Sequence, residues 1–178
     1  MSDRFPAQIW IGGQVPDKNI SGLIEALVAD DASHEYGDVG ISKDCTRTEL
    51  LELYLNEGIL HFKDDEAPIG EFLHTETFCM EHGIAWDRNS DHYCEYDAEN
   101  VYWRPGKNSS LVFRYANSNG HEIIAAAPVR EALALLNDAE GPSTRNPVSQ
   151  ALIERAIVLL NETCPELPPK LENFEIIS

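Results

Sequence analysis

Acidic side chains follow two of the expected strands at a spacing that could bind a divalent cation. They stand at Asp64, Asp65, Glu66, Asp87, Asp91, Asp97 and Glu99. Carboxylates at strand ends can hold Mg²⁺ or Mn²⁺ while the phosphates of a substrate complete the coordination. This pattern suggests a metal-dependent enzyme acting on a phosphate-containing substrate, although the spacing matches no phosphate-handling motif.

The same carboxylates have a simpler explanation. In a chain with 31 Asp and Glu residues, neighbouring acids in a loop are expected by chance. Asp65 or Glu66 would also stabilise the start of a following helix by capping its free amide groups and by opposing its dipole. The metal hypothesis therefore stays an alternative.

Two Cys/His pairs contain the residue types of a zinc site. Cys79 and His82 are three residues apart on one expected helix, and His92 and Cys94 alternate on one face of an expected strand. Each pair could present two ligands to one tetrahedral ion, but their combined spacing follows no common zinc fold. The other explanation is that Cys79 is a small core residue and that His82 favours the helix C-terminus.

Covalent catalysis has weaker support in the sequence. Triads can be written from Ser90, His92 and Asp97, or from Cys94, His92 and Glu95. Triad members ordinarily converge from separate elements, however, and the chain has no G-x-S-x-G motif. No cofactor is expected either, because there is no phosphate-binding Walker loop. The sequence leans away from an enzyme.

The elements that must position these residues alternate between strand and helix in the first part of the chain. The capping-box residues Thr46 and Glu49 predict a helix start, and Gly58 and Gly83 are expected helix C-caps. Strands are expected at 8–11, 34–41, 59–63, 84–86 and within 93–103, and helices at 20–28, 46–58 and 68–83.

The pattern changes at Pro105–Asn108. Strands at 111–115 and 121–126 flank a hairpin signal at 117–120, and helices begin at Pro128 and Pro147. Their expected inward residues are Val129, Ala132, Leu133 and Leu136, then Val148, Leu152, Ala156, Ile157 and Leu160. The end of the chain is expected to be an extended tail. The predicted fold class is α+β, with a mixed sheet from alternating β-α segments (about 8–104), a hairpin and two helices. Residues 1–106 and 107–178 would form two domains or one continuous domain.

The net charge is −18 at pH 7, and −16 of it falls within residues 25–100. Phosphate contacts are made by Lys and Arg, so this charge argues against direct binding to nucleic acid or to an anionic membrane. Because the acidic segment is expected to fold, its carboxylates would be held in fixed positions. The uneven distribution argues against adaptation to high salt, and solubility is the plain alternative.

The ends and cysteines suggest a cytoplasmic protein. The start has no secretory pattern, and no stretch approaches 18 consecutive apolar residues. Cys45, Cys79, Cys94 and Cys164 are far apart, which is typical of reduced thiols. Aromatic residues between Trp86 and Trp103 suit a sheet core or, amid carboxylates, a protein interface.

The leading hypothesis is a non-enzymatic acidic interaction protein that docks on a basic surface of another protein. A carboxylate array of this kind could occupy a nucleic-acid-binding groove of a host enzyme or defence complex, as phage and mobile-element inhibitors do when they act as DNA mimics. The expected partner-binding residues are Asp64, Asp65, Glu66, Asp87, Asp91, Glu95, Asp97 and Glu99. The apolar helices after residue 107 could form a homodimer. The remaining alternative is an acidic cytosolic domain of another function.

Overall fold

A computed structural model of the chain describes residues 3–106, 109–117, 121–139 and 147–178. It divides into two compact units, which we describe separately. Unit 1 comprises Met1–His121 and Pro168–Ser178, and unit 2 is Glu122–Leu167. This division differs from the expected boundary after Gly106, because the strand beyond that glycine still pairs with the sheet and the chain's last segment returns to unit 1.

The elements of unit 1 confirm the predicted α+β class. Its strands are β1 (Arg4–Gly12), β2 (Gln14–Pro16), β3 (Leu55–Asn56), β4 (Ile59–Pro68), β5 (Ala85–Ser90), β6 (Ala98–Trp103), β7 (Val112–Ala116) and β9 (Glu175–Ile177). Its helices are a 3₁₀ turn (Asp17–Asn19), α1 (Ile20–Ala29), α2 (Arg47–Tyr54) and α3 (Leu73–His82).

Within unit 1 the main sheet has the strand order β3-β4-β1-β5-β6-β7, and β8 (Glu122–Ile123) belongs to unit 2. Strands β4 and β5 both pair antiparallel with β1, so β4, α3 and β5 form a β-α-β unit with β1 inserted between its strands. The sheet is antiparallel rather than mixed. The parallel pair, β2 with β9, belongs to a separate two-stranded sheet.

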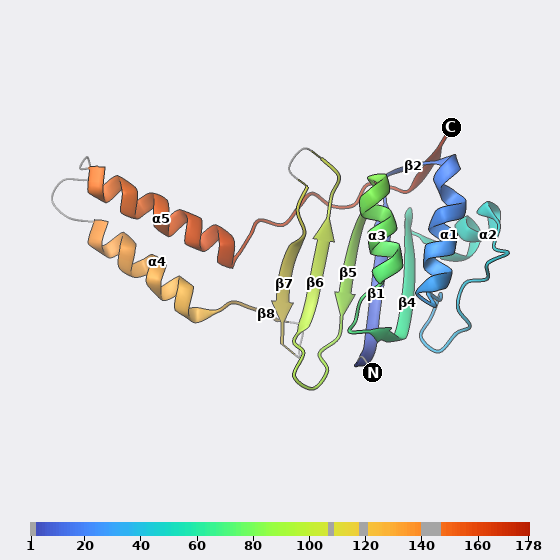
Figure 1. Ribbon diagram of the computed structural model, residues 1–178, viewed down its shortest axis with the longest axis horizontal. Coiled ribbons are helices and arrows are strands. Elements are labelled where there is room, and N and C mark those ends of the chain that lie inside the picture. The colour runs from blue at the N-terminus through green and yellow to red at the C-terminus, as the bar shows by residue number, and fades with distance from the viewer. Residues whose placement is uncertain (1–2, 107–108, 118–120, 140–146) are drawn as a thin grey trace. The chain divides into compact units, whose positions relative to one another are not determined.

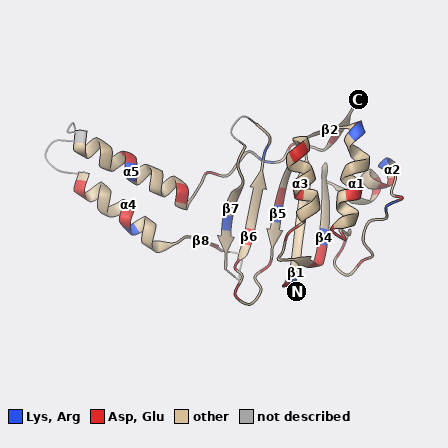
Figure 2. Ribbon diagram, viewed as in Figure 1, with Lys and Arg blue, Asp and Glu red and all other residues tan. Residues whose placement is uncertain are grey.

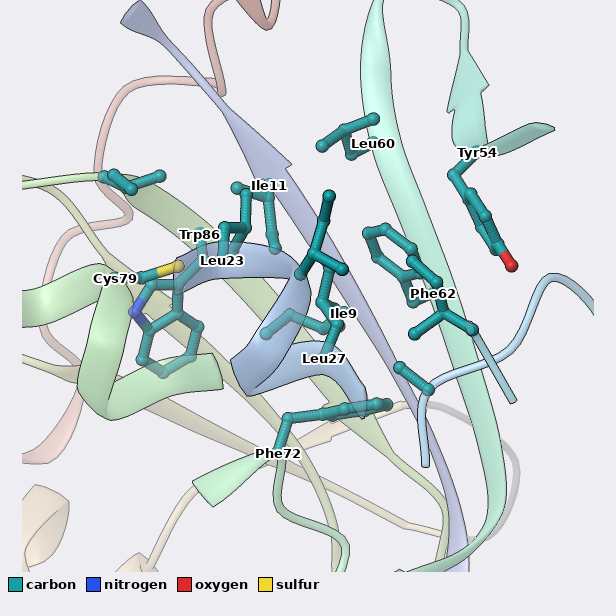
Figure 3. Packing of buried hydrophobic residues seen from close by; sticks show 14 of the residues in the cluster. Ile9, Ile11, Leu23, Leu27, Tyr54, Leu60, Phe62, Phe72, Cys79 and Trp86 are labelled. Carbon is teal, nitrogen blue, oxygen red and sulfur yellow. The ribbon is translucent and has the colours of Figure 1, made fainter. Parts of the chain in front are cut away.

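One face of the main sheet carries the core. Along β1 alternate side chains are buried, and Ile9 and Ile11 meet Leu23 and Leu27 of α1 (Figures 1 and 3). Helices α1 and α3 pack side by side on this face. The period of two in the strand and of about 3.6 in the helix thus places both apolar faces together.

Local signals explain two of the helix ends in unit 1, the start of α2 and the end of α3. The predicted capping box of α2 is present, since the Thr46 side chain accepts the amide of Glu49 and the Glu49 carboxylate accepts the amide of Thr46. Gly83 ends α3 in the left-handed conformation, as expected. Gly58 does not cap a helix. Together with Glu57 it forms a two-residue turn between β3 and β4, and both residues have positive φ.

Two further predictions were wrong. The segment 34–41 forms bends and turns instead of a strand, and only Ser33 makes an isolated bridge, to Lys63. The acids 64–66 do not end their strand, because β4 continues through them to Pro68, and α3 correspondingly begins at Leu73 rather than near Pro68. Pairing with β1 overrides the turn preference of the acids. The expected hairpin turn at 117–120 lies mostly outside the described residues.

The predicted extended tail is confirmed, and it docks on unit 1. The amide of Gly13 donates to the carbonyl of Glu172, that of Phe174 to Gly58 and that of Glu175 to Gly13, at 2.7–3.0 Å. The Phe174 side chain is buried in the core. Because these backbone bonds and one aromatic anchor hold it to the turns after β1 and before β4, the tail is part of the fold of unit 1.

Gly12→Ala is expected to release this tail. An alanine Cβ would overlap the carbonyl oxygen of Glu172 and lie 3.2 Å from Cβ of Leu171. The free energy of unfolding should fall by about 1–3 kcal/mol, as for other overpacking changes. Limited trypsin digestion followed by mass spectrometry should show faster cleavage after Lys170 than in wild type. An unchanged cleavage rate would contradict the docked tail.

Unit 2 contains helices α4 (Ala126–Ala139) and α5 (Pro147–Thr163), which pack against each other (Figure 1). Both expected helices are thus present. Of the residues expected to face inward, Ala132 and Ala156 are buried, whereas Leu133 and Ile157 are 54% and 50% exposed. Only small side chains fit where two helices approach closely, so the larger aliphatic residues lie at the flanks.

No helix in the described part of the chain is long and apolar enough to cross a membrane. All four cysteines lie among the described residues and form no disulfide there, with Cys79 buried and Cys94 exposed.

Candidate partner-binding surface

Carboxylates from three separate parts of unit 1 meet at one end of the main sheet. The end of β4, the start of β1 and the end of β5 lie together, because Ala7 pairs with both Asp64 and Ser90. The amide of Asp91 also donates to the carbonyl of Pro6 at 3.0 Å. We call this region the acidic end, and define it as Asp30, Asp31, Asp64, Asp65, Glu66, Glu71, Asp91, Glu95 and Asp97 (Figure 2).

A pocket of about 420 Å³ opens within the acidic end. Its acidic lining residues are Asp30, Asp31, Asp64, Asp65, Glu66 and Glu71. Arg4 also lines it, but its guanidinium donates to the backbone carbonyl of Glu66 at 2.8 Å. The pocket wall is held in place by Asp30, whose two carboxylate oxygens accept the amides of His74 and Thr75 at the start of α3. These contacts fix the wall before any partner arrives.

Two titratable groups report the negative charge of this region. Burial raises the pKa of Asp64, and the nearby Asp31 and Asp65 carboxylates act in the same direction, although its Oδ1 accepts the amide of Glu66 at 2.9 Å. Burial, reinforced by the Asp91 carboxylate, raises the pKa of Tyr36 to about 12. Burial is the largest cause of both shifts, and neighbouring carboxylates add to it, although the Arg4 charge lowers the pKa of Asp64.

The β5–β6 connection presents two further acids on a braced turn. Tyr93 and Tyr96 bridge through both backbone amides, and their rings pack on Phe5 with centroids 5.7 and 5.5 Å away. Glu95 and Asp97 are exposed on this turn. The aromatic contacts tie the turn to β1, so these carboxylates are positioned by the sheet and not by a free loop.

The structure therefore brings together six of the eight expected partner-binding residues and leaves two outside. Asp87 faces the other side of β5, where its oxygens accept both terminal nitrogens of Arg104 at 2.6 and 3.2 Å. Glu99 pairs with Arg88 at 2.6 Å. These two acids are neutralised within the protein.

Arg88 occupies a buried site shared by two carboxylates. Its side chain is 1% exposed, its Nη1 donates to the carbonyl of Gly70 at 2.6 Å, and its Nε lies 2.8 Å from Glu76. Burial raises the pKa of Glu76 to about 7, while the Arg88 charge and a hydrogen bond from the Phe72 amide oppose that rise. This cluster stabilises the junction of α3, β5 and β6.

The two expected zinc-ligand pairs do not converge. Cys79 and His82 lie on α3 before the start of β5, whereas His92 and Cys94 follow its end, across a strand of roughly 20 Å. Cys79 is buried, which raises the pKa of its thiol, and the ring of His82 packs on Phe78. A tetrahedral ion needs ligands within about 2.0–2.3 Å, so these four residues cannot share one.

The carboxylates of the magnesium hypothesis likewise do not converge on a metal site in the described part of the chain. Among the residues that the structure describes, no group of three or more His, Cys, Asp or Glu side chains is arranged to hold a metal ion. For the proposed triads, Ser90 is buried while His92, Asp97, Cys94 and Glu95 are exposed in the turn.

Sequence reasoning missed Asp30, Asp31 and Glu71 in the acidic end. Asp30 and Asp31 follow the predicted helix 20–28 directly, and Glu71 precedes α3. The sequence feature that could have identified them is that acids follow the predicted helix ends as well as the predicted strand ends. The packing of α1 against α3 is what places them beside β4.

No protein-family model, curated protein or solved structure matches this chain.

Proposed function

We propose that the protein binds a basic surface of a nucleic-acid-binding protein through its acidic end, and so competes with nucleic acid for that surface. The observation that supports this proposal is the convergence of carboxylates from the end of α1, the end of β4 and the β5–β6 turn. Six of the nine residues of the acidic end are exposed. The carboxylates of Asp30 and Asp64 accept backbone amides, which hold them in place without neutralising them. An inhibitor from a phage or mobile element is the class of protein that this activity fits.

A rigid acidic surface favours such a role for electrostatic reasons. Like charges held together raise the free energy of the folded state, over a range of about 10 Å at 0.1 M salt. A basic partner relieves this repulsion when it binds. Complementary charge also speeds association and excludes acidic competitors.

The pocket in the acidic end gives the proposal a specific contact. Its volume of about 420 Å³ and its acidic lining would accept the side chain of a lysine or arginine from the partner. Apolar lining from Pro68, Ile69 and Leu73 would contact the aliphatic part of that side chain. The pocket would thus select a partner by the shape of its side chain as well as by its charge.

Neutralising the acidic end should weaken partner binding more than neutralising acids elsewhere. The test variant carries Asp65→Asn, Glu66→Gln and Glu95→Gln. The matched control carries Glu52→Gln, Glu57→Gln and Glu81→Gln, which are also exposed and change the net charge equally. A partner is captured from the native host at low salt and purified, and its Kd is measured for each protein by calorimetry. The test variant should bind at least about tenfold more weakly, or about 1.4 kcal/mol.

Two further results are expected from the same material. Raising the salt concentration should weaken wild-type binding more steeply than binding of the test variant, because fewer charge contacts remain. Nucleic acid that binds the partner should displace the wild-type protein. Equal Kd values for the test and control variants would overturn the proposal, since binding would then depend on total charge alone.

A further inference from the structure

Unit 2 buries little of its own apolar surface. Where α4 and α5 approach each other, the buried side chains are Ala132, Ala139, Ser149 and Ala156. Larger aliphatic residues beside this seam stay half-buried or exposed. A pair of helices this short gains most of its stability from covering an apolar face, so this surface needs a contact.

On each helix the apolar residues extend further to one side of the seam than to the other, where Leu135, Leu152 and Leu159 lie only about 40–60° from it. At about 100° per residue, Val129, Leu136 and Leu133 lie roughly 40–100° from Ala132 on α4. By the same geometry Leu160, Ile153 and Ile157 lie roughly 40–100° from Ala156 on α5. The offset has the same sign in both helices. We call these six residues the aliphatic face.

Equal offsets on two antiparallel helices point to the same side of the pair. An ion pair confirms this geometry: Glu131 and Arg155 both lie about 100° from the seam in the opposite sense, and their side chains meet at 3.2 Å. On this side the apolar residues therefore end at a polar margin, where Glu131 and Arg155 lie beyond Leu135, Leu152 and Leu159. The other side is the aliphatic face, and none of its six side chains is fully buried.

We propose that the aliphatic face binds the same face of a second copy of this chain, so that two pairs of helices form a four-helix bundle. Two helices with short connections and one uncovered aliphatic face are half of such a bundle. A two-fold arrangement would cover both faces with identical surfaces. This interface is separate from the acidic end.

Charge favours a second copy over other occupants of the face. Residues 122–167 contribute −4 to the net charge of −18, so two copies repel each other least through unit 2. The margins of the face also have opposite signs, with Arg130 on α4 and Glu154 on α5. A two-fold bundle that places α4 of one copy over α5 of the other brings these residues together. A basic partner that binds the acidic end would have no comparable charge complementarity with the uncharged aliphatic face.

Sedimentation equilibrium of the full chain tests the proposal with neighbouring residues as variant and control. Ile157 lies in the aliphatic face, whereas Val158 is 55% exposed on the side away from it. Wild type should be a dimer, Ile157→Glu should raise the dimer Kd by about 100-fold or more, and Val158→Glu should leave it within about twofold. Leu133→Ser, a milder change in the same face, should raise the Kd by a smaller factor with the helical circular dichroism signal retained.

A monomeric wild type at high micromolar concentration would overturn the proposal. So would equal effects of Ile157→Glu and Val158→Glu on the dimer Kd, because the aliphatic face would then not form the contact between the copies. Salt separates this proposal from the function proposed above. Sulfate strengthens apolar association, whereas it screens binding through the acidic end, so either can fail alone.

Discussion

Arg88→Met is expected to lower the free energy of unfolding by about 3–5 kcal/mol, the usual range for removing one partner of a buried ion pair. Methionine keeps much of the length of the side chain but removes the charge that Glu76 and Glu99 share. It also leaves the carbonyl of Gly70 without its donor. Urea unfolding followed by tryptophan fluorescence measures the difference. A loss below about 1 kcal/mol would show that the cluster is effectively solvated.

The cost of Arg88→Met should depend on pH in a defined direction. The folded protein raises the pKa of Glu76 from 4.5 to about 7, so it binds that proton more tightly than the unfolded chain. The stabilising contribution of this proton is complete below pH 4.5 and is lost as the pH rises through 7. The Arg88 charge opposes the rise in the Glu76 pKa, so removing it raises that pKa further, and Arg88→Met should lose less stability at pH 5 than at pH 8.

Glu76→Gln is the control for this pH dependence. The amide does not titrate, so the stability of wild type should fall relative to Glu76→Gln between about pH 4.5 and 7. Parallel stability curves for the two proteins would show that another group causes the effect.

Gly70→Ala should destabilise the same junction through the backbone. Gly70 has φ +71°, and a Cβ there would overlap the ring of Phe5 and lie 2.7 Å from Cβ of Ser90. The left-handed conformation costs a non-glycine residue about 1–2 kcal/mol, and overpacking adds about 1–3 kcal/mol. We expect the free energy of unfolding to fall by about 2–5 kcal/mol in total, measured by urea unfolding at pH 7.

Gly106→Ala provides the matched control. Apart from its chain neighbours, no atom of the described residues lies within 4 Å of the Cβ it would add, and its φ is not in the left-handed region. Its stability should stay within about 0.5 kcal/mol of wild type. Similar losses for both variants would mean that Gly70 is not constrained by Phe5 and Ser90.

Short-range patterns predicted the local elements well where the physics is local. The capping box at Thr46 and the glycine end at Gly83 depend on bonds within one turn, and both are present. The apolar stripe of 20–28 likewise produced α1. The strand predicted at 34–41 did not form, because Gly37 has a positive φ and only the neighbouring Ser33 pairs with a strand. Strand formation depends on pairing with a distant segment, which composition does not reveal.

The sequence predicted that the candidate site would be acidic, but not which residues would form it. The sequence showed that −16 of the charge falls within residues 25–100. It did not show that Asp87 would pair with Arg104, or Glu99 with Arg88, because in each pair the arginine and the acid come from different parts of the β5–β6 hairpin. It also gave no reason to join Asp30 to the acids of β4.

The sequence by itself determined the α+β class, the positions of most helices and strands and the concentration of acids in one segment, because propensity, periodicity and capping act over a few residues. Only the tertiary structure decided which carboxylates stay free. The sheet register sets Asp64 and Asp91 at the same end of β1 and turns Asp87 to Arg104. Tertiary packing likewise left Leu133 and Ile157 uncovered, since two helices can share only one narrow seam. Pairing between distant segments sets the free energy of each charge and each apolar side chain, and no local pattern specifies that pairing.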